Sequence, residues 1–105
     1  MPMEDPVLAR IIQEIVHLVH PLRIILFGSA ARGTAQSGSD LDLMVIVPDN
    51  ADRKQALDMI NRNVHRPEIP LDVLVATPAI VERHRDNPGL IYRTILATGK
   101  LVYAA

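Results

Sequence analysis

Hydrophobic residues recur at helical spacing in the first part of the chain and form continuous runs of strand length after it. From Pro6 to Pro21, apolar residues return every three or four positions with polar residues between them. This pattern predicts an amphipathic helix that ends at Pro21. Apolar runs rich in β-branched residues at 22–27, 41–47 and 69–76 predict three buried strands.

The segments between and after these runs carry helix and turn signals. Thr77-Pro78 and Asn87-Pro88 each place a capping residue before a proline, so we expect helices at 77–85 and 87–98, the second ending at Gly99. Weaker periodicity predicts a helix at 51–65, a helical turn at 30–32, a loop at 33–39 and a short last strand at 101–103. The order predicts an α/β fold (α+β) with a small mixed central β-sheet flanked by helices.

Composition narrows the class of protein. A length of 105 residues suits one domain, residues 1–105. The absence of cysteine excludes disulfides and thiolate metal sites. The net charge of −1, with no basic stripe, is no signature of nucleic-acid binding. No secretion signal and no apolar run near the roughly 20 residues of a membrane span is visible, so we expect a cytoplasmic protein with no membrane partner.

Three aspartates stand in or beside the predicted strands. Asp42 and Asp72 each interrupt an apolar run, and Asp40 lies two residues before Asp42 and therefore on the same side of the strand. If the two strands are neighbours, all three carboxylates converge. Two such charges about 4 Å apart repel by about 4 kcal/mol at an effective dielectric constant of about 20. A hard divalent cation, Mg²⁺ or Mn²⁺, would relieve this repulsion, although each acid taken singly is equally compatible with an exposed strand end.

Gly28 and Ser29 directly follow the first predicted strand. Backbone N–H groups at such a turn commonly hold a phosphate, and glycine permits close approach of the backbone. Taken alone, a Gly-Ser pair is more often only a turn, and the P-loop pattern is absent. Together with a predicted metal site on the next strand, the pair favours phosphoryl or nucleotidyl chemistry.

These residues match a family pattern. Gly28-Ser29, ten residues, then Asp40-Leu41-Asp42 is the G-S-x₁₀-D-x-D motif of the DNA polymerase β superfamily. The segment LFGSAARGTAQSGSDLDLMVIV resembles its minimal nucleotidyltransferase (MNT) subgroup, and the resemblance extends over IPLDVLV and NPGLIYRTILATGKLVY. Ala30 is a departure, because many relatives carry arginine there. The loss of this arginine would weaken a phosphate contact and leave the three acids intact.

The resemblance implies a polymerase β-like nucleotidyltransferase core and a two-metal mechanism. Asp40 and Asp42 would bind two Mg²⁺ ions, and Asp72 would bind the ion nearer the acceptor and help deprotonate its hydroxyl. The region of Gly28 and Ser29 would hold the β- and γ-phosphates of a nucleoside triphosphate, with Arg32 as an additional phosphate ligand, although an exposed, solvated arginine is an equal alternative for Arg32. The hydroxyl would attack the α-phosphate, and pyrophosphate would leave.

The resemblance also implies a partner. MNT proteins are typically paired with HEPN-domain proteins, so the chain is expected to be the antitoxin of a type VII-like toxin–antitoxin pair. It would transfer AMP from ATP to a tyrosine of the HEPN ribonuclease toxin. Two alternatives stay open: a non-catalytic antitoxin that acts by binding, and a small-molecule nucleotidyltransferase that works as an oligomer. The complete set of Gly28, Ser29, Asp40, Asp42 and Asp72 favours the enzyme, since a binding-only protein needs no converging acids.

Overall fold

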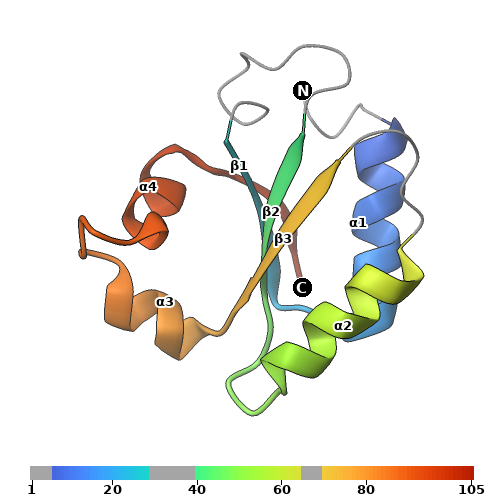
Figure 1. Cartoon of the computed structure of the whole chain (residues 1–105), viewed down its shortest axis with the longest axis horizontal. Coiled ribbons are helices and arrows are strands. Elements are labelled where there is room, and N and C mark those ends of the chain that lie inside the picture. Colours follow the sequence, from blue (N-terminus) through green and yellow to red (C-terminus); the bar gives the residue numbers. More distant parts are fainter. Residues whose placement is uncertain (1–5, 29–39, 65–69) are drawn as a thin grey trace.

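The computed structural model describes residues 6–28, 40–64 and 70–105. Within these residues the chain forms four helices and four strands, in an α/β arrangement with one mixed sheet (Figure 1). The helices are α1 (Pro6–Val19), α2 (Arg53–Asn63), α3 (Pro78–His84) and α4 (Ile91–Thr98). The strands are β1 (Arg23–Phe27), β2 (Leu41–Ile46), β3 (Leu71–Ala76) and β4 (Lys100–Ala104).

The sheet has the order β3-β2-β1-β4, so β3 and β4 are its edges. β1 pairs antiparallel with β2 and with β4, whereas β2 and β3 are parallel. Parallel strands need a crossover connection, and α2 provides it between β2 and β3. As a result, β2 and β3, the two strands that carry Asp42 and Asp72, begin at the same end of the sheet.

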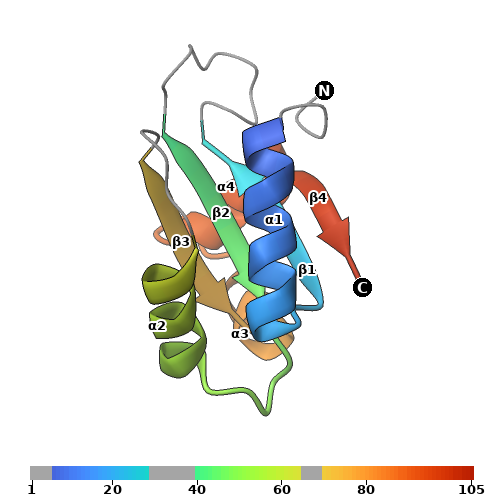
Figure 2. The same cartoon turned by 90° about the vertical axis from the view of Figure 1, so that its right-hand side faces the viewer.

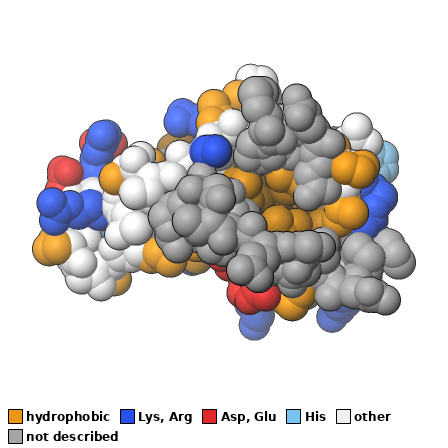
Figure 3. Space-filling model, turned by 90° about the horizontal axis from the view of Figure 1, so that it is seen from above, with side chains coloured by type: hydrophobic (Ala, Val, Ile, Leu, Met, Phe, Trp, Pro, Cys, Tyr) orange, Lys and Arg blue, Asp and Glu red, His pale blue; other side chains and the backbone are white. Residues whose placement is uncertain are grey.

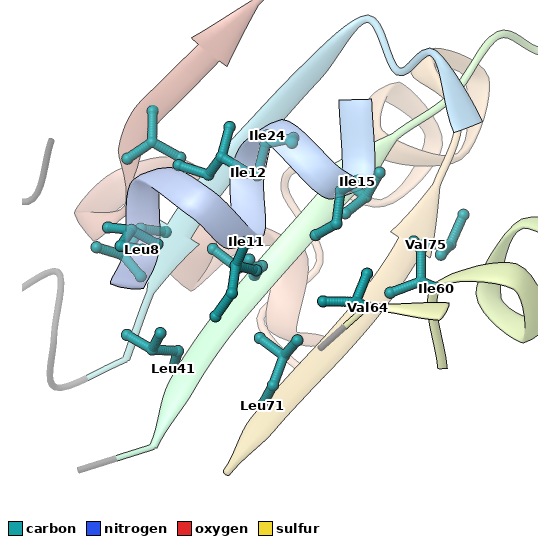
Figure 4. Close-up of a cluster of buried hydrophobic side chains, with 14 of the residues drawn as sticks. Leu8, Ile11, Ile12, Ile15, Ile24, Leu41, Ile60, Val64, Leu71 and Val75 are labelled. Carbon is teal, nitrogen blue, oxygen red and sulfur yellow. The ribbon is translucent and has the colours of Figure 1, made fainter. Parts of the chain in front are cut away.

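The helices cover both faces of the sheet, with α1 and α2 on one face and α3 and α4 on the other (Figures 1 and 2). The larger core lies under α1, whose four central apolar residues are buried against the alternate residues of the strands (Figure 4). Its members include Leu8, Ile11, Ile12, Ile15, Ile24, Leu41, Ile60, Val64, Leu71 and Val75. A smaller core under α3 and α4 holds Ile25, Met44, Ile46, Ala76 and Ile95.

Most predicted elements are confirmed, with shifted ends. The signal at Thr77-Pro78 is correct, because the Thr77 hydroxyl accepts a hydrogen bond from the N–H of Ile80 at 3.3 Å and Pro78 begins α3. Gly99 ends α4 as expected, donating its N–H to the carbonyl of Ile95. The predicted turn at 30–32 and the loop at 33–39 lie outside the described residues.

One expected helix start is wrong. Asn87 does not cap α4; its side-chain oxygen accepts the N–H of Gly89 at 2.9 Å and closes a local turn. The helix begins only at Ile91, with Leu90 at the capping position and no side-chain capping bond. Asparagine before proline is a signal that turns and helix caps share, and here the turn uses it.

Candidate functional site

Asp42 and Asp72 lie directly beside each other in the sheet. They are register partners in the parallel pairing of β2 with β3, and neighbouring strands are about 4.8 Å apart. Both side chains project from the face that carries α3 and α4, since Met44 on β2 and Leu74 on β3 belong to the core under these helices. The structure therefore brings together two of the three predicted carboxylates through the pairing of strands far apart in the sequence.

The environment of Asp42 disfavours its charged form. Burial raises the pKa of the Asp42 carboxyl above its ordinary value, and the charges of Asp72 and then Asp40 raise it further. A hydrogen bond between the side chains of Asp42 and Asp72 acts in the same direction. The Asp42 carboxyl therefore takes up a proton, or the charge of another cation, more readily than an ordinary aspartate does.

Asp40 contributes charge rather than contact. It lies one residue before β2 and is exposed to solvent, as is Asp72, whereas Asp42 is partly buried. In residues 6–28, 40–64 and 70–105, no three histidine or acidic side chains are arranged to hold a metal ion. The described geometry thus consists of a close pair, Asp42 and Asp72, with Asp40 acting on Asp42 through its charge.

Gly28 forms the wall of this site on the side of β1. Phe27, the last residue of β1, is the register partner of Asp42, and Gly28 follows it with φ of 77°. A Cβ atom at Gly28 would lie 2.3 Å from Oδ2 of Asp42, so the Asp42 carboxylate would have to move if another residue stood here. The position therefore requires glycine twice, for its left-handed backbone and for the space that the Asp42 carboxylate occupies.

The residues below the carboxylates are apolar. Phe27 directly precedes Gly28, Met44 lies two residues after Asp42, and Leu74 lies two residues after Asp72. All three pack in the core under α3 and α4. This apolar floor removes water from one side of Asp42, in agreement with burial as the main cause of its raised pKa. Figure 3 views the end of the molecule at which β2 begins; acidic side chains show at its lower edge and at its left end, and hydrophobic groups are exposed on the same face.

The donor set suits a divalent cation. Oxygen atoms from carboxylates that repel one another are the ligands that Mg²⁺ and Mn²⁺ accept, and the space kept free by Gly28 is filled by the Asp42 carboxylate itself. Ser29 and Arg32, the other residues expected to bind a nucleotide, lie outside the described residues.

A second feature was not foreseen from the sequence. A hollow of about 700 Å³ runs along β3 between α2 and α3, and Arg53 reaches into this region to donate from Nε to the carbonyl oxygen of Val75 at 3.2 Å. No local pattern could have indicated it, because it depends on β3 being an edge strand. None of the helices in the described part of the chain has the length and apolar character needed to cross a membrane.

Comparison with known proteins agrees with this fold. The model of the nucleotidyltransferase domain family matches residues 8–101. A crystal structure of a protein from Sulfolobus solfataricus assigned to the nucleotidyltransferases superposes with a TM-score of 0.60 and 21% identity, covering 91% of this chain and 77% of that one. A chain of a toxin–antitoxin structure solved with AMP-PNP gives a TM-score of 0.58 and 20% identity, covering 92% and 73%. At these identities, the two structures show a shared fold. No curated protein matches the chain significantly.

Proposed function

Since the chain belongs to the nucleotidyltransferase domain family, we propose that it transfers AMP from ATP to a hydroxyl group of a partner protein. The observation that carries this proposal is the close pair of Asp42 and Asp72, held on one face of the sheet with Gly28 against it. A protein that only binds its partner has no use for two carboxylates that raise each other's energy.

Asp40, Asp42 and Asp72 would hold the divalent ions, two Mg²⁺ or Mn²⁺. When bound, such ions supply positive charge to the attacking and leaving oxygens of an in-line displacement. Asp42 is the partly buried member, so it orients the site, whereas the exposed Asp72 faces the side from which an acceptor can arrive. We assign to Asp72 the additional task of receiving the proton of the acceptor hydroxyl.

The reaction balances with these groups alone. The acceptor oxygen forms a bond to the α-phosphorus of ATP, the bond from that phosphorus to the bridging oxygen breaks, and pyrophosphate leaves. Gly28 has no side chain to displace the Asp42 carboxylate from this site. Ser29 and Arg32, in the following segment, complete the nucleotide site in this proposal.

We propose that the acceptor is a tyrosine of a HEPN ribonuclease toxin and that the chain is the antitoxin of a type VII-like pair. The fold shared with a chain from a toxin–antitoxin structure supports this partner class. The near-neutral chain, with a net charge of −1, gives no support to a nucleic-acid acceptor.

The test is transfer of label from ATP labelled at its α-phosphorus, with Mg²⁺, to the product of the neighbouring gene. We expect an AMP-sized mass gain on that protein, absent with Asp42→Asn. Asp58→Asn is the matched control, because it removes the same charge from an exposed position of α2. A tight complex without any transfer would refute the enzymatic proposal and favour an antitoxin that acts by binding.

A further inference from the structure

The outer side of β3 carries backbone groups that no described strand uses. β3 is an edge of the sheet and pairs only with β2 among the described residues. The carbonyls of Pro70 and Ala76 point to the β2 side, where they accept N–H groups at 2.9 Å each. The carbonyl of Val75 points outward, to Arg53.

Backbone groups alternate between the two sides along a strand. Because Pro70 and Ala76 face β2 and Val75 faces outward, the N–H and C=O groups of Leu71, Val73 and Val75 belong to the free edge. Among the described residues, only the Val75 carbonyl has a partner there, the Arg53 side chain. An extended chain could pair with this edge as an added strand.

The free edge connects the carboxylates to the hollow along β3. Asp72 lies between Leu71 and Val73, exposed and next to Asp42. The hollow of about 700 Å³ begins at Val73 and continues past Val75 towards α3. A strand added to this edge would therefore pass directly beside Asp72 and enter the hollow.

The charged side chains around the hollow differ in whether they already have a partner. The carboxylates of Asp49 and Asp52 already accept the N–H groups of Ala79 and Gln55, at 3.0 and 3.1 Å. Lys54 also lines the hollow and, in the part of the chain that the structure describes, has no ion pair. Positive charge from Lys54 and Arg53 is thus available at the end of the edge away from Asp72.

We propose that the free edge of β3 binds an extended segment of the acceptor protein, with the modified hydroxyl residue beside Asp72 and an acidic residue three positions away at Arg53 and Lys54. This inference rests on the proposed function for the role of the hydroxyl. Asp72 and Val75 are three residues apart, about 10 Å along a strand. They also face opposite sides of the sheet, since Val75 packs in the core under α1 and α2. Backbone hydrogen bonds would supply affinity and the two side chains specificity.

Binding can be tested without nucleotide or metal. Two soluble peptides of alternating Thr and Val would carry tyrosine and glutamate three positions apart, in either order. Each is titrated into the ¹⁵N-labelled protein to millimolar concentration and followed by NMR. We expect one of them to shift the amides of Leu71, Val73 and Val75, and a version with lysine in place of glutamate to bind more weakly.

Variants test separately the contact with the acidic residue and the backbone pairing at the edge. Lys54→Glu should weaken binding of the glutamate peptide by about two- to fivefold, the range for an exposed ion pair. Arg93→Glu, an equal charge reversal at an exposed position of α4, should have no effect. Val73→Pro removes an outward N–H without removing a bond to β2, so it should abolish binding while the protein stays folded. If this variant does not fold, the Lys54 comparison decides alone.

Shifts that avoid the β3 edge, no shifts at all, or equal binding to wild type and Lys54→Glu would each overturn the inference. Failure of the proposed function would look different: the peptide would bind at the edge, yet no AMP would be transferred to its tyrosine or to the partner. Transfer to the partner with unchanged rates in Lys54→Glu would instead leave the enzyme intact and refute the binding edge.

Discussion

Gly28 leaves free the space that the Asp42 carboxylate fills at the end of β1: a Cβ atom on Gly28 would lie 2.3 Å from Oδ2 of Asp42. Thirteen residues lie between them in the sequence, and the antiparallel pairing of β1 with β2 brings them together. The glycine of the motif therefore has a steric relationship to its acid as well as to a nucleotide.

Gly28→Ala should damage both stability and activity. Alanine in the left-handed region costs about 1–2 kcal/mol, and its methyl group would force the Asp42 carboxylate to move. We expect a lower melting temperature and loss of AMP transfer, measured by calorimetry and label transfer. Gly89→Ala is the control, since its methyl group would meet only the Asn87 side chain, at 3.3 Å. Wild-type activity in Gly28→Ala would show that Asp42 can relocate freely.

Asp42→Asn should raise stability at neutral pH. The pKa of Asp42 is raised in the folded protein, so the folded state holds its proton more tightly than the unfolded state does. Stability is then full below the ordinary carboxyl pKa and is lost as the pH rises through the folded value. Asparagine does not titrate, so its advantage should appear at pH 7 and vanish in acid. Urea unfolding across this pH range, in EDTA, measures it; a variant less stable than wild type at pH 7 would contradict the argument.

The cause of the raised pKa can be separated by a second variant. Asp72→Asn removes a negative charge next to Asp42 and changes their shared hydrogen bond. The pKa of the Asp42 carboxyl should therefore fall towards its ordinary value without reaching it, because burial is the larger cause. An NMR titration of the carboxyl carbon reads this directly. No change in the pKa of Asp42 in Asp72→Asn would mean that Asp72 does not contribute and that burial and the charge of Asp40 raise it.

Divalent ions should stabilise the wild-type protein. Binding to the folded state alone adds about 2.7 kcal/mol at a hundredfold excess over the dissociation constant, and Mg²⁺ would also relieve the repulsion around Asp42. We expect Mg²⁺ to raise the melting temperature of wild type and of Asp58→Asn, and to have little effect on Asp42→Asn. EDTA should reverse the gain. An equal rise in all three proteins would indicate ion binding elsewhere.

The start of α3 has two side-chain caps from different parts of the chain. Thr77 accepts the N–H of Ile80, and Asp49, from the loop after β2, accepts the N–H of Ala79. Replacement of either by alanine should cost about 1 kcal/mol, which lowers the melting temperature of a domain of this size by roughly 4–8 °C. Glu82→Ala, which removes only an exposed ion pair with Arg85, should change stability by less than about 1 kcal/mol.

The local pattern of the sequence was sufficient to predict most of the helices and strands and to select the candidate site residues. The first three strands are apolar runs with one charged residue in each, and α1 is an amphipathic repeat; these patterns depend only on neighbouring residues. The aspartates were visible for the same reason, as charges inside apolar strands. The start of α4 was predicted wrongly at Asn87, because a short-range signal does not distinguish a turn from a helix cap.

Only the tertiary structure decided which residues meet. The parallel pairing of β2 with β3 places Asp72 beside Asp42, and the end of β1 places Gly28 against the same carboxylate. Strand order also makes β3 an edge, with its outward backbone groups and the hollow beside Arg53. These relationships join residues far apart along the chain, and they depend on how the sheet and its two helical layers bury their apolar faces together. A local pattern carries no information about that choice.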